Sequence, residues 1–172
     1  MKKNKAIRLK AVTVGAMMAA LSIILERVLP ITPPSNVIDI RITLSNVPII
    51  LTSVLVSPIA GALCGVVSDI IGCFISGYAP FPLLTLAPLV MGLLPGIAMG
   101  KKGSYSFVRV LLAVTVTHIL ASVLITTIGL CVMKGAPFIP MLITRLPSCG
   151  INLVIDVALV YLLLKSPLHK NF

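Results

Sequence analysis

Long apolar runs alternate with short polar or proline-rich breaks along this chain. A helix needs roughly 20 apolar residues to cross the hydrocarbon of a bilayer. The pattern predicts six membrane-spanning helices, at about residues 8–29, 43–56, 58–76, 82–100, 110–133 and 144–165. Because the second run is short, we expect this helix to be tilted or to begin below the bilayer surface.

Glycine and proline mark the breaks between the runs, because neither residue continues a helix well. A polar connection that opens with Lys-Lys-Gly at 101–103 separates the fourth and fifth runs. The lysines before the first run resemble the start of a signal peptide. That run is long, however, it lacks a clear small-residue cleavage site, and five more runs follow it, so we predict that it is retained as a helix.

The composition supports a membrane protein. Apolar residues make up 58% of the 172 residues and charged residues 10%, whereas a soluble domain carries about 25% charged residues. So few charges cannot coat a surface, which excludes a soluble globular domain and a disordered tail. The sequence therefore predicts an all-α membrane protein in which residues 1–172 form one integral membrane domain.

The positive charge is distributed unevenly between the two ends of the predicted bundle. Of the 14 Lys and Arg residues, ten fall at the two termini and in the fourth connection, and four fall at the opposite end. The end with more Lys and Arg is expected to be cytoplasmic, which places both termini inside. This rule accounts for most of the net charge of +10, so no nucleic-acid partner is indicated.

Four cations lie at the predicted external end: Arg27, Arg41, Lys134 and Arg145. Lys134 is interpreted as an ordinary interfacial lysine. Arg41 and Arg145 lead into spans flanked by proline or polar residues. We expect Arg145 to open the sixth helix, where its guanidinium and the helix dipole would act on the same anion.

Ionisable groups inside the spans are candidates for function, because placing them in lipid is expensive. Asp69, in the third span, is either a helix–helix hydrogen-bond partner or an acceptor for N–H groups of a substrate ring. Asp156, in the sixth span, is expected to make a structural hydrogen bond. His118, in the fifth span, is expected to be a packing histidine with a satisfied ring.

The third connection, Gly-Tyr-Ala-Pro-Phe-Pro at 77–82, is aromatic and stiffened by proline. Its Tyr78 and Phe81 either anchor the interface or cover an apolar pocket and stack on a planar ligand. Thr85 follows one turn into the fourth span.

Small residues recur at helical spacing in the first span: Ala11, Gly15 and Ala19 in one stripe, with Ala16 and Ala20 in its neighbour. Such stripes let another helix approach closely. They either pack inside this bundle or dock a partner.

Motifs for other chemistry are missing. The sequence has no P-loop, no HExxH and no GxSxG, and its four cysteines form no CxxC pair. The sequence therefore indicates neither an ATP-hydrolysing site, nor an enzyme, nor a metal site, and it calls for no cofactor.

Five segments are similar to one known family. They are ALSIILER at 20–27, IRITLSNVPI at 40–49, SPIAGA at 57–62 with SDIIG at 68–72, GYAPFPLLTL at 77–86, and TRLP at 144–147 with Asn152 downstream. The chain resembles the substrate-binding S components of energy-coupling factor (ECF) vitamin transporters, especially the folate family.

The resemblance implies a six-helix binding protein of the cell membrane that captures a vitamin from outside. Such a protein docks through its first helix onto a transmembrane T component that carries two ATP-binding-cassette (ABC) ATPases, and ATP hydrolysis there leads to release inside. The small residues of the first span resemble the family's docking surface.

Folate is a dianion with a flat, hydrogen-bonding ring, and the candidate site suits it. Arg27, Arg41 and Arg145 would pair with the carboxylates. Asp69, Thr85 and Asn152 would read the ring edge, with Tyr78 or Phe81 stacked over it. Alternatives are another cargo, such as pantothenate, a pyrimidine or a queuosine precursor, a proton-driven carrier acting alone, a membrane scaffold, or a membrane enzyme.

Overall fold

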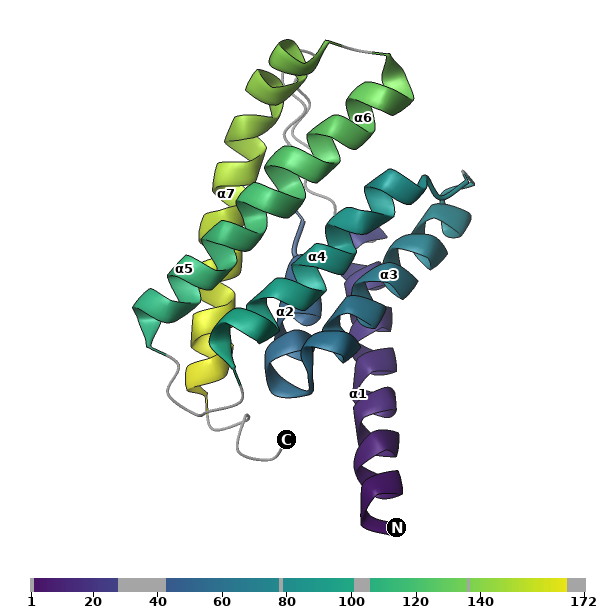
Figure 1. Ribbon diagram of the computed structural model, residues 1–172, viewed down its shortest axis with the longest axis vertical. Coiled ribbons are helices and arrows are strands. Elements are labelled where there is room, and N and C mark those ends of the chain that lie inside the picture. The colour runs from purple at the N-terminus through teal and green to yellow at the C-terminus, as the bar shows by residue number, and fades with distance from the viewer. Residues whose placement is uncertain (1, 28–42, 78, 101–105, 136, 167–172) are drawn as a thin grey trace.

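A computed structural model of the chain describes residues 2–27, 43–77, 79–100, 106–135 and 137–166, with side chains from Val12 onward. In these ranges every regular secondary-structure element is a helix. The elements are α1 (Lys2–Arg27), α2 (Asn46–Leu55), α3 (Pro58–Ile75), α4 (Pro82–Met99), α5 (Phe107–His118), the π-helix η1 (Ile119–Ile125), α6 (Thr126–Lys134) and α7 (Phe138–Lys165). Because α5, η1 and α6 run on as one continuous helix, the described residues form six rods, as the apolar runs predicted (Figure 1).

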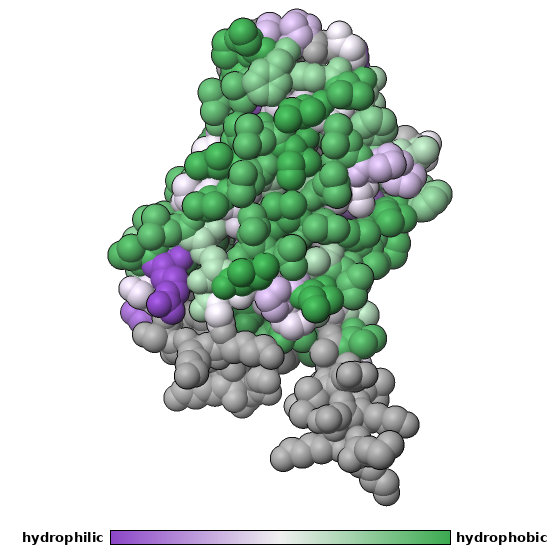
Figure 2. Space-filling model, in the orientation of Figure 1, coloured by the Kyte–Doolittle hydropathy of each residue, from purple (hydrophilic) through white to green (hydrophobic). Residues whose placement is uncertain are grey.

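The outer surface of the bundle is suited to lipid. Four of its helical rods are long and apolar enough to cross a membrane: Pro58–Ile75, Pro82–Met99, Phe107–Lys134 and Phe138–Lys165. Hydrophobic side chains cover most of the face that α4, α5 and α6 present in Figure 2. An exposed apolar surface of this extent marks a membrane-embedded protein.

The helix α2 is short because it lies inside the bundle. Its ten residues carry buried side chains at every position from Val47 to Val54. It packs against α1, α3, α4 and α7, so its unbroken apolar character reflects burial within protein. That this helix is tilted or begins below the bilayer surface stays a prediction.

Local chemistry sets the helix ends. The Ser57 hydroxyl caps α3 by accepting a hydrogen bond from the Ala60 amide at 3.1 Å. Pro58 occupies the first turn of α3, where a backbone N–H would have no partner within the helix, so the missing N–H of proline costs no hydrogen bond. Gly135 ends α6 in the left-handed region at φ 63°, which glycine adopts without strain.

Glycines allow α2, α3 and α4 to approach closely. A Cβ on Gly61 would collide with the Gly92 carbonyl oxygen, and one on Gly65 with the Pro88 carbonyl oxygen. The Ser53 hydroxyl of α2 accepts a hydrogen bond from the Gly96 amide of α4 at 2.9 Å. Pro88 and Pro95, which donate no backbone hydrogen bond, also lie inside α4.

The last helix begins earlier than the sequence pattern predicted. The apolar run placed its start at residue 144, whereas α7 begins at Phe138. Pro140 was interpreted as part of a break, but it lies in the first turn of α7. An amide there has no partner within the helix, so proline is tolerated.

Candidate functional site

Arg27 ends α1 and lies against α3 at the end of the bundle opposite to the start of α1 (Figure 1). Gly72 of α3 makes room for it, since a Cβ on Gly72 would lie only 3.0 Å from a terminal nitrogen of the Arg27 guanidinium. The side chain of Arg27 is partly buried. The guanidinium is therefore held within the bundle at this end and does not extend freely into the headgroup region.

Asp69 lies one turn before Gly72 on α3 and bonds across to α4. The Thr85 hydroxyl lies 2.8 Å from Asp69 Oδ2 and 3.3 Å from the carbonyl oxygen of Phe81. A hydroxyl has one proton, and the shorter bond to a charged acceptor is the stronger one. Thr85 therefore donates to Asp69, and Asp69 is a helix–helix partner, one of the two roles that the sequence left open.

Asp69 keeps acceptor capacity beyond this bond. A carboxylate accepts about four hydrogen bonds, and both Asp69 and Phe81 are only partly buried. The carbonyl oxygen of Phe81, the N-cap residue of α4, lies beside the Thr85 hydroxyl. Arg27, Asp69, Phe81 and Thr85 thus form one cluster at the ends of α1, α3 and α4.

A second group of polar residues lies along one face of α7. Ser148, Asn152 and Asp156 follow Arg145 by three, seven and eleven residues, and this spacing places all four on the same side of a helix. Ser148 and Asp156 are buried, and Arg145 and Asn152 are partly buried. This face therefore points into the bundle.

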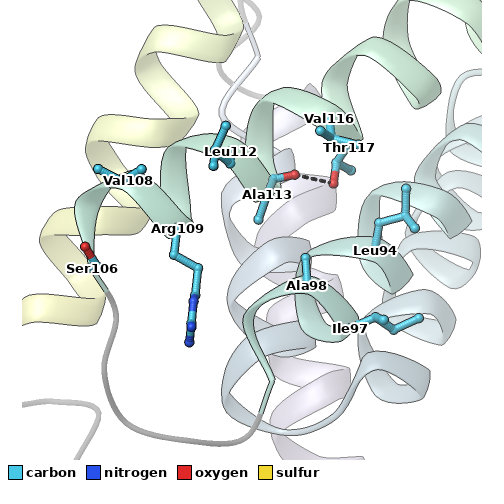
Figure 3. Close-up of a pocket in the computed structure, with 10 residues that line it drawn as sticks. All are labelled: Leu94, Ile97, Ala98, Ser106, Val108, Arg109, Leu112, Ala113, Val116 and Thr117. Atoms are coloured by element: carbon cyan, nitrogen blue, oxygen red, sulfur yellow. Dashed lines mark hydrogen bonds between the residues drawn. The ribbon is translucent and has the colours of Figure 1, made fainter.

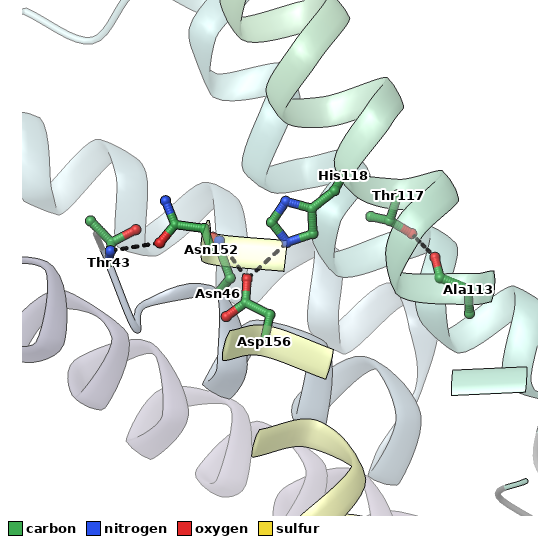
Figure 4. A network of polar contacts seen from close by, with 7 residues as sticks. All are labelled: Thr43, Asn46, Ala113, Thr117, His118, Asn152 and Asp156. Atoms are coloured by element: carbon green, nitrogen blue, oxygen red, sulfur yellow. Dashed lines mark hydrogen bonds and ion pairs between the residues drawn. The ribbon is translucent and has the colours of Figure 1, made fainter. Parts of the chain in front are cut away.

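The inner end of this face holds a buried network that joins three helices (Figure 4). Asp156 Oδ2 accepts a hydrogen bond from the Asn46 amide of α2 at 3.0 Å and lies 2.8 Å from His118 Nε2 of α5. Asp156 has no exposed surface and His118 retains 2%. The structural bond expected for Asp156 is present, whereas the satisfied ring expected for His118 is not, because its buried Nδ1 has no hydrogen-bond partner among the described residues.

Asn152 ties the chain before α2 to α7. Its side-chain oxygen accepts a hydrogen bond from the Thr43 amide at 2.9 Å (Figure 4). This oxygen therefore positions the segment that leads into α2, a role that the sequence did not suggest.

The structure corrects the position of Arg145. The sequence predicted that this residue opens the sixth helix, but α7 begins at Phe138, two turns earlier. The influence of a helix dipole falls off within the first turn. The predicted combination of guanidinium and helix N-terminus is therefore wrong, and Arg145 acts through its own charge from the inner face of α7.

Two predicted site residues, Arg41 and Tyr78, lie outside the described residues. The side chain of Ala11 does as well. The structure thus brings Arg27, Asp69, Phe81 and Thr85 together, and it places Arg145 and Asn152 on a separate helix.

The small residues of α1 divide between two faces. Ala19 is 5% exposed and belongs to a buried cluster with Ile49 and Cys64. Ala16 and Ala20 are exposed, and Gly15 has open space where a side chain would be. Each interpretation offered by the sequence thus fits part of the stripe: Ala19 packs inside, while Ala16 and Ala20 face outward.

The contact between His118 and Asp156 was not predicted from the sequence. His118 and Asp156 were each judged alone, and nothing in the sequence pairs two residues 38 positions apart. The π-helix η1, which begins directly after His118, was also missed. A signal was present for it, since Thr and Ser residues cluster around 115–127 in an otherwise apolar run, and π-helical turns are common at functional sites.

The side chains in these two clusters are suited to bind a polar ligand. Guanidinium groups can form paired, bidentate hydrogen bonds with carboxylates, and the carboxylates accept N–H groups. Within the described residues no group of three His, Cys, Asp or Glu side chains is close enough to hold a metal ion.

Sequence comparison establishes the class of protein. The profile of the family described as "ECF transporter, substrate-specific component" matches residues 10–164. The chain therefore belongs to this family, whose members are membrane-embedded binding components of transporters and not enzymes.

Comparison with solved structures supports the same fold. A crystal structure of FolT bound with folic acid superposes with a TM-score of 0.70 at 21% sequence identity, covering 90% of this chain and 92% of that chain. A sequence search of curated proteins finds no match. The protein is thus an integral membrane S component that has the fold of FolT.

Proposed function

We propose that this S component binds folate, or an anion of the same pterin–glutamate type, at the end of the bundle opposite the chain termini. The observation that carries the proposal is that Arg27 and Arg145 both lie partly buried at this end. Guanidinium groups pair with carboxylates through two parallel hydrogen bonds, and a dicarboxylate offers two such carboxylates at this end. The likeness to a folic acid-bound FolT supports folate over other anions.

The two clusters suit the two ends of such a ligand. Carboxylates of the glutamate tail would pair with guanidinium groups, whereas the amino and ring N–H groups of a pterin are donors that need acceptors. Asp69 retains acceptor capacity beside Thr85, and the aromatic ring of Phe81 in the same cluster is suited to stack on a flat ring. Arg41, Tyr78 and Asn152 complete the proposed site.

Orientation follows from the distribution of Lys and Arg. We propose that the end with both termini faces the cytoplasm, so that the site opens outward. Uptake would then require a T component with two ABC ATPases, which the exposed small residues Ala16 and Ala20 of α1, with Gly15, are suited to contact.

The ligand that copurifies with the protein tests this proposal. Protein purified from cells grown with folate, with bound small molecules identified by mass spectrometry after denaturation, should release folate at near one equivalent. Recovery of pantothenate, a pyrimidine or a queuosine precursor would show that folate is not the ligand. The assignment of the protein as an S component would still hold. In vesicles, uptake that proceeds without any ATPase would instead indicate a proton-driven carrier.

A further inference from the structure

A cavity between α4 and α5 is lined by none of the residues of the proposed vitamin site. It has a volume of about 580 Å³, within the range of about 300–1,000 Å³ that is usual for ligand sites. Side chains of Leu94, Ile97 and Ala98 from α4 and of Leu112 and Val116 from α5 line it (Figure 3). We call this cavity the α4–α5 groove.

The walls of the α4–α5 groove are apolar along its length. Thr117 contributes a hydroxyl, but that hydroxyl donates to the Ala113 carbonyl oxygen at 2.7 Å and is therefore satisfied within α5 (Figure 3). Ala98 and Ala113 are small and leave space between the two helices. The groove is thus shaped to take an apolar chain and offers it no hydrogen bond.

One end of the groove is cationic. Arg109 lines it and is exposed, and among the described residues its guanidinium makes no ion pair or hydrogen bond to another side chain. Ser106, the N-cap of α5, makes no side-chain cap bond, so the first amides of this helix also present positive charge at this end. Both residues lie at the end of the bundle where α1 begins and α7 ends (Figure 1).

We infer that the α4–α5 groove binds an anionic phospholipid. The acyl chain would occupy the apolar walls, and the phosphate would pair with the Arg109 guanidinium and hydrogen-bond to Ser106. An arginine that merely reaches toward the headgroups would bind the phosphate of any phospholipid. The groove adds a fixed position for the chain and a second donor for the phosphate, and the uncompensated cation favours a lipid with a net negative charge.

Fluorescence provides a direct test, because the chain contains no tryptophan. In nanodiscs, a single reporter at Leu112→Trp is quenched by phospholipids that carry brominated acyl chains. At equal mole fraction, quenching should indicate that brominated phosphatidylglycerol is enriched about fivefold at the groove over brominated phosphatidylcholine. This ratio corresponds to about 1 kcal/mol, the attraction of one basic residue for anionic lipid at a membrane surface.

Matched controls separate a site from general attraction. Leu162→Trp places a reporter on an exposed position of α7 at the same end of the bundle and should show no lipid preference. Arg109→Gln in the Leu112→Trp background should remove the preference, whereas Lys165→Gln, which removes an exposed cation elsewhere at that end, should keep it.

Three results would overturn the inference. Equal quenching by both lipids at Leu112→Trp would mean that the groove does not select charge. A preference that survives Arg109→Gln, or that appears equally at Leu162→Trp, would mean that anionic lipid gathers around the whole bundle.

Discussion

His118 and Asp156 lie 2.8 Å apart across the interface of α5 and α7, with the Asn46 amide on the same carboxylate oxygen. Asp156 Oδ2 is thus the atom on which contacts from α2 and α5 meet. The other atoms, His118 Nδ1 and Asp156 Oδ1, are buried and have no hydrogen-bond partner among the described residues. The network thus joins α2, α5 and α7 at the depth where η1 begins.

Removing the carboxylate should destabilise the bundle. Asp156→Ala leaves the buried imidazole and the Asn46 amide unsatisfied, and each such group costs about 1–3 kcal/mol. Asp156→Asn keeps an acceptor oxygen at the same place and should lose less. Thermal unfolding of the purified protein should therefore rank wild type above Asp156→Asn and Asp156→Asn above Asp156→Ala. Equal stability of the two variants would show that the hydrogen bonds contribute nothing.

Two glycines of α3 and α4 should respond differently to alanine. At Gly72 the new methyl group meets the end of the flexible Arg27 side chain, whereas at Gly92 it meets the backbone of Gly61. Gly72→Ala is expected to fold and to weaken folate binding by displacing the guanidinium. Gly92→Ala is expected to lower the thermal stability sharply, because α3 and α4 must separate.

Size-exclusion chromatography and a folate titration distinguish the two outcomes. If Gly72→Ala binds folate as wild type does, then the position of Arg27 against α3 is irrelevant to the ligand.

The Thr85 hydroxyl is expected to matter through Asp69. Thr85→Val keeps the shape of the side chain and removes the 2.8 Å hydrogen bond. The dissociation constant for folate should rise about tenfold, since a hydrogen bond to a charged group is worth about 1.5 kcal/mol or more. Thr85→Ser retains the donor and should bind within about twofold of wild type. Identical affinities of the Val and Ser variants would remove Thr85 from the site.

The outward-facing alanines of α1 predict a separation of binding from transport. Ala16→Leu places a large side chain on an exposed position, so folate binding should be unchanged while ATP-dependent uptake by the assembled transporter falls at least about tenfold through lost close packing. Ala19→Leu instead overfills a buried cluster with Ile49 and Cys64 and should reduce thermal stability. Full uptake by Ala16→Leu would place the docking surface elsewhere.

Much of the fold follows from sequence because the bilayer limits the choices. Every predicted span corresponds to a helical rod, and breaks such as Ser57-Pro58 and the glycine at 135 lie where helices end. The start of α7 was misplaced because Pro140 breaks a helix in its interior and is tolerated in a first turn.

The candidate site was less predictable, because it depends on contacts between distant segments. Residue type identified Arg27, Asp69 and Thr85 as unusual at their positions, but only the packing of α1, α3 and α4 brings them into one cluster. The division of the α1 stripe depended likewise on which neighbours cover Ala19. Periodicity places residues on a face, and it does not tell which face is covered.

The central claim is that outer arginines bind a dianionic vitamin, and calorimetric titration of folate into purified Arg145→Gln tests it most directly. Arg145 lies on the inner face of α7 and is partly buried, and the loss of a charged hydrogen-bond pair of about 1.5–3 kcal/mol predicts an affinity about 10- to 150-fold weaker. Lys134→Gln, which removes an exposed cation from the end of α6, should bind as wild type does. A wild-type affinity for Arg145→Gln, in protein that remains folded, would contradict the account.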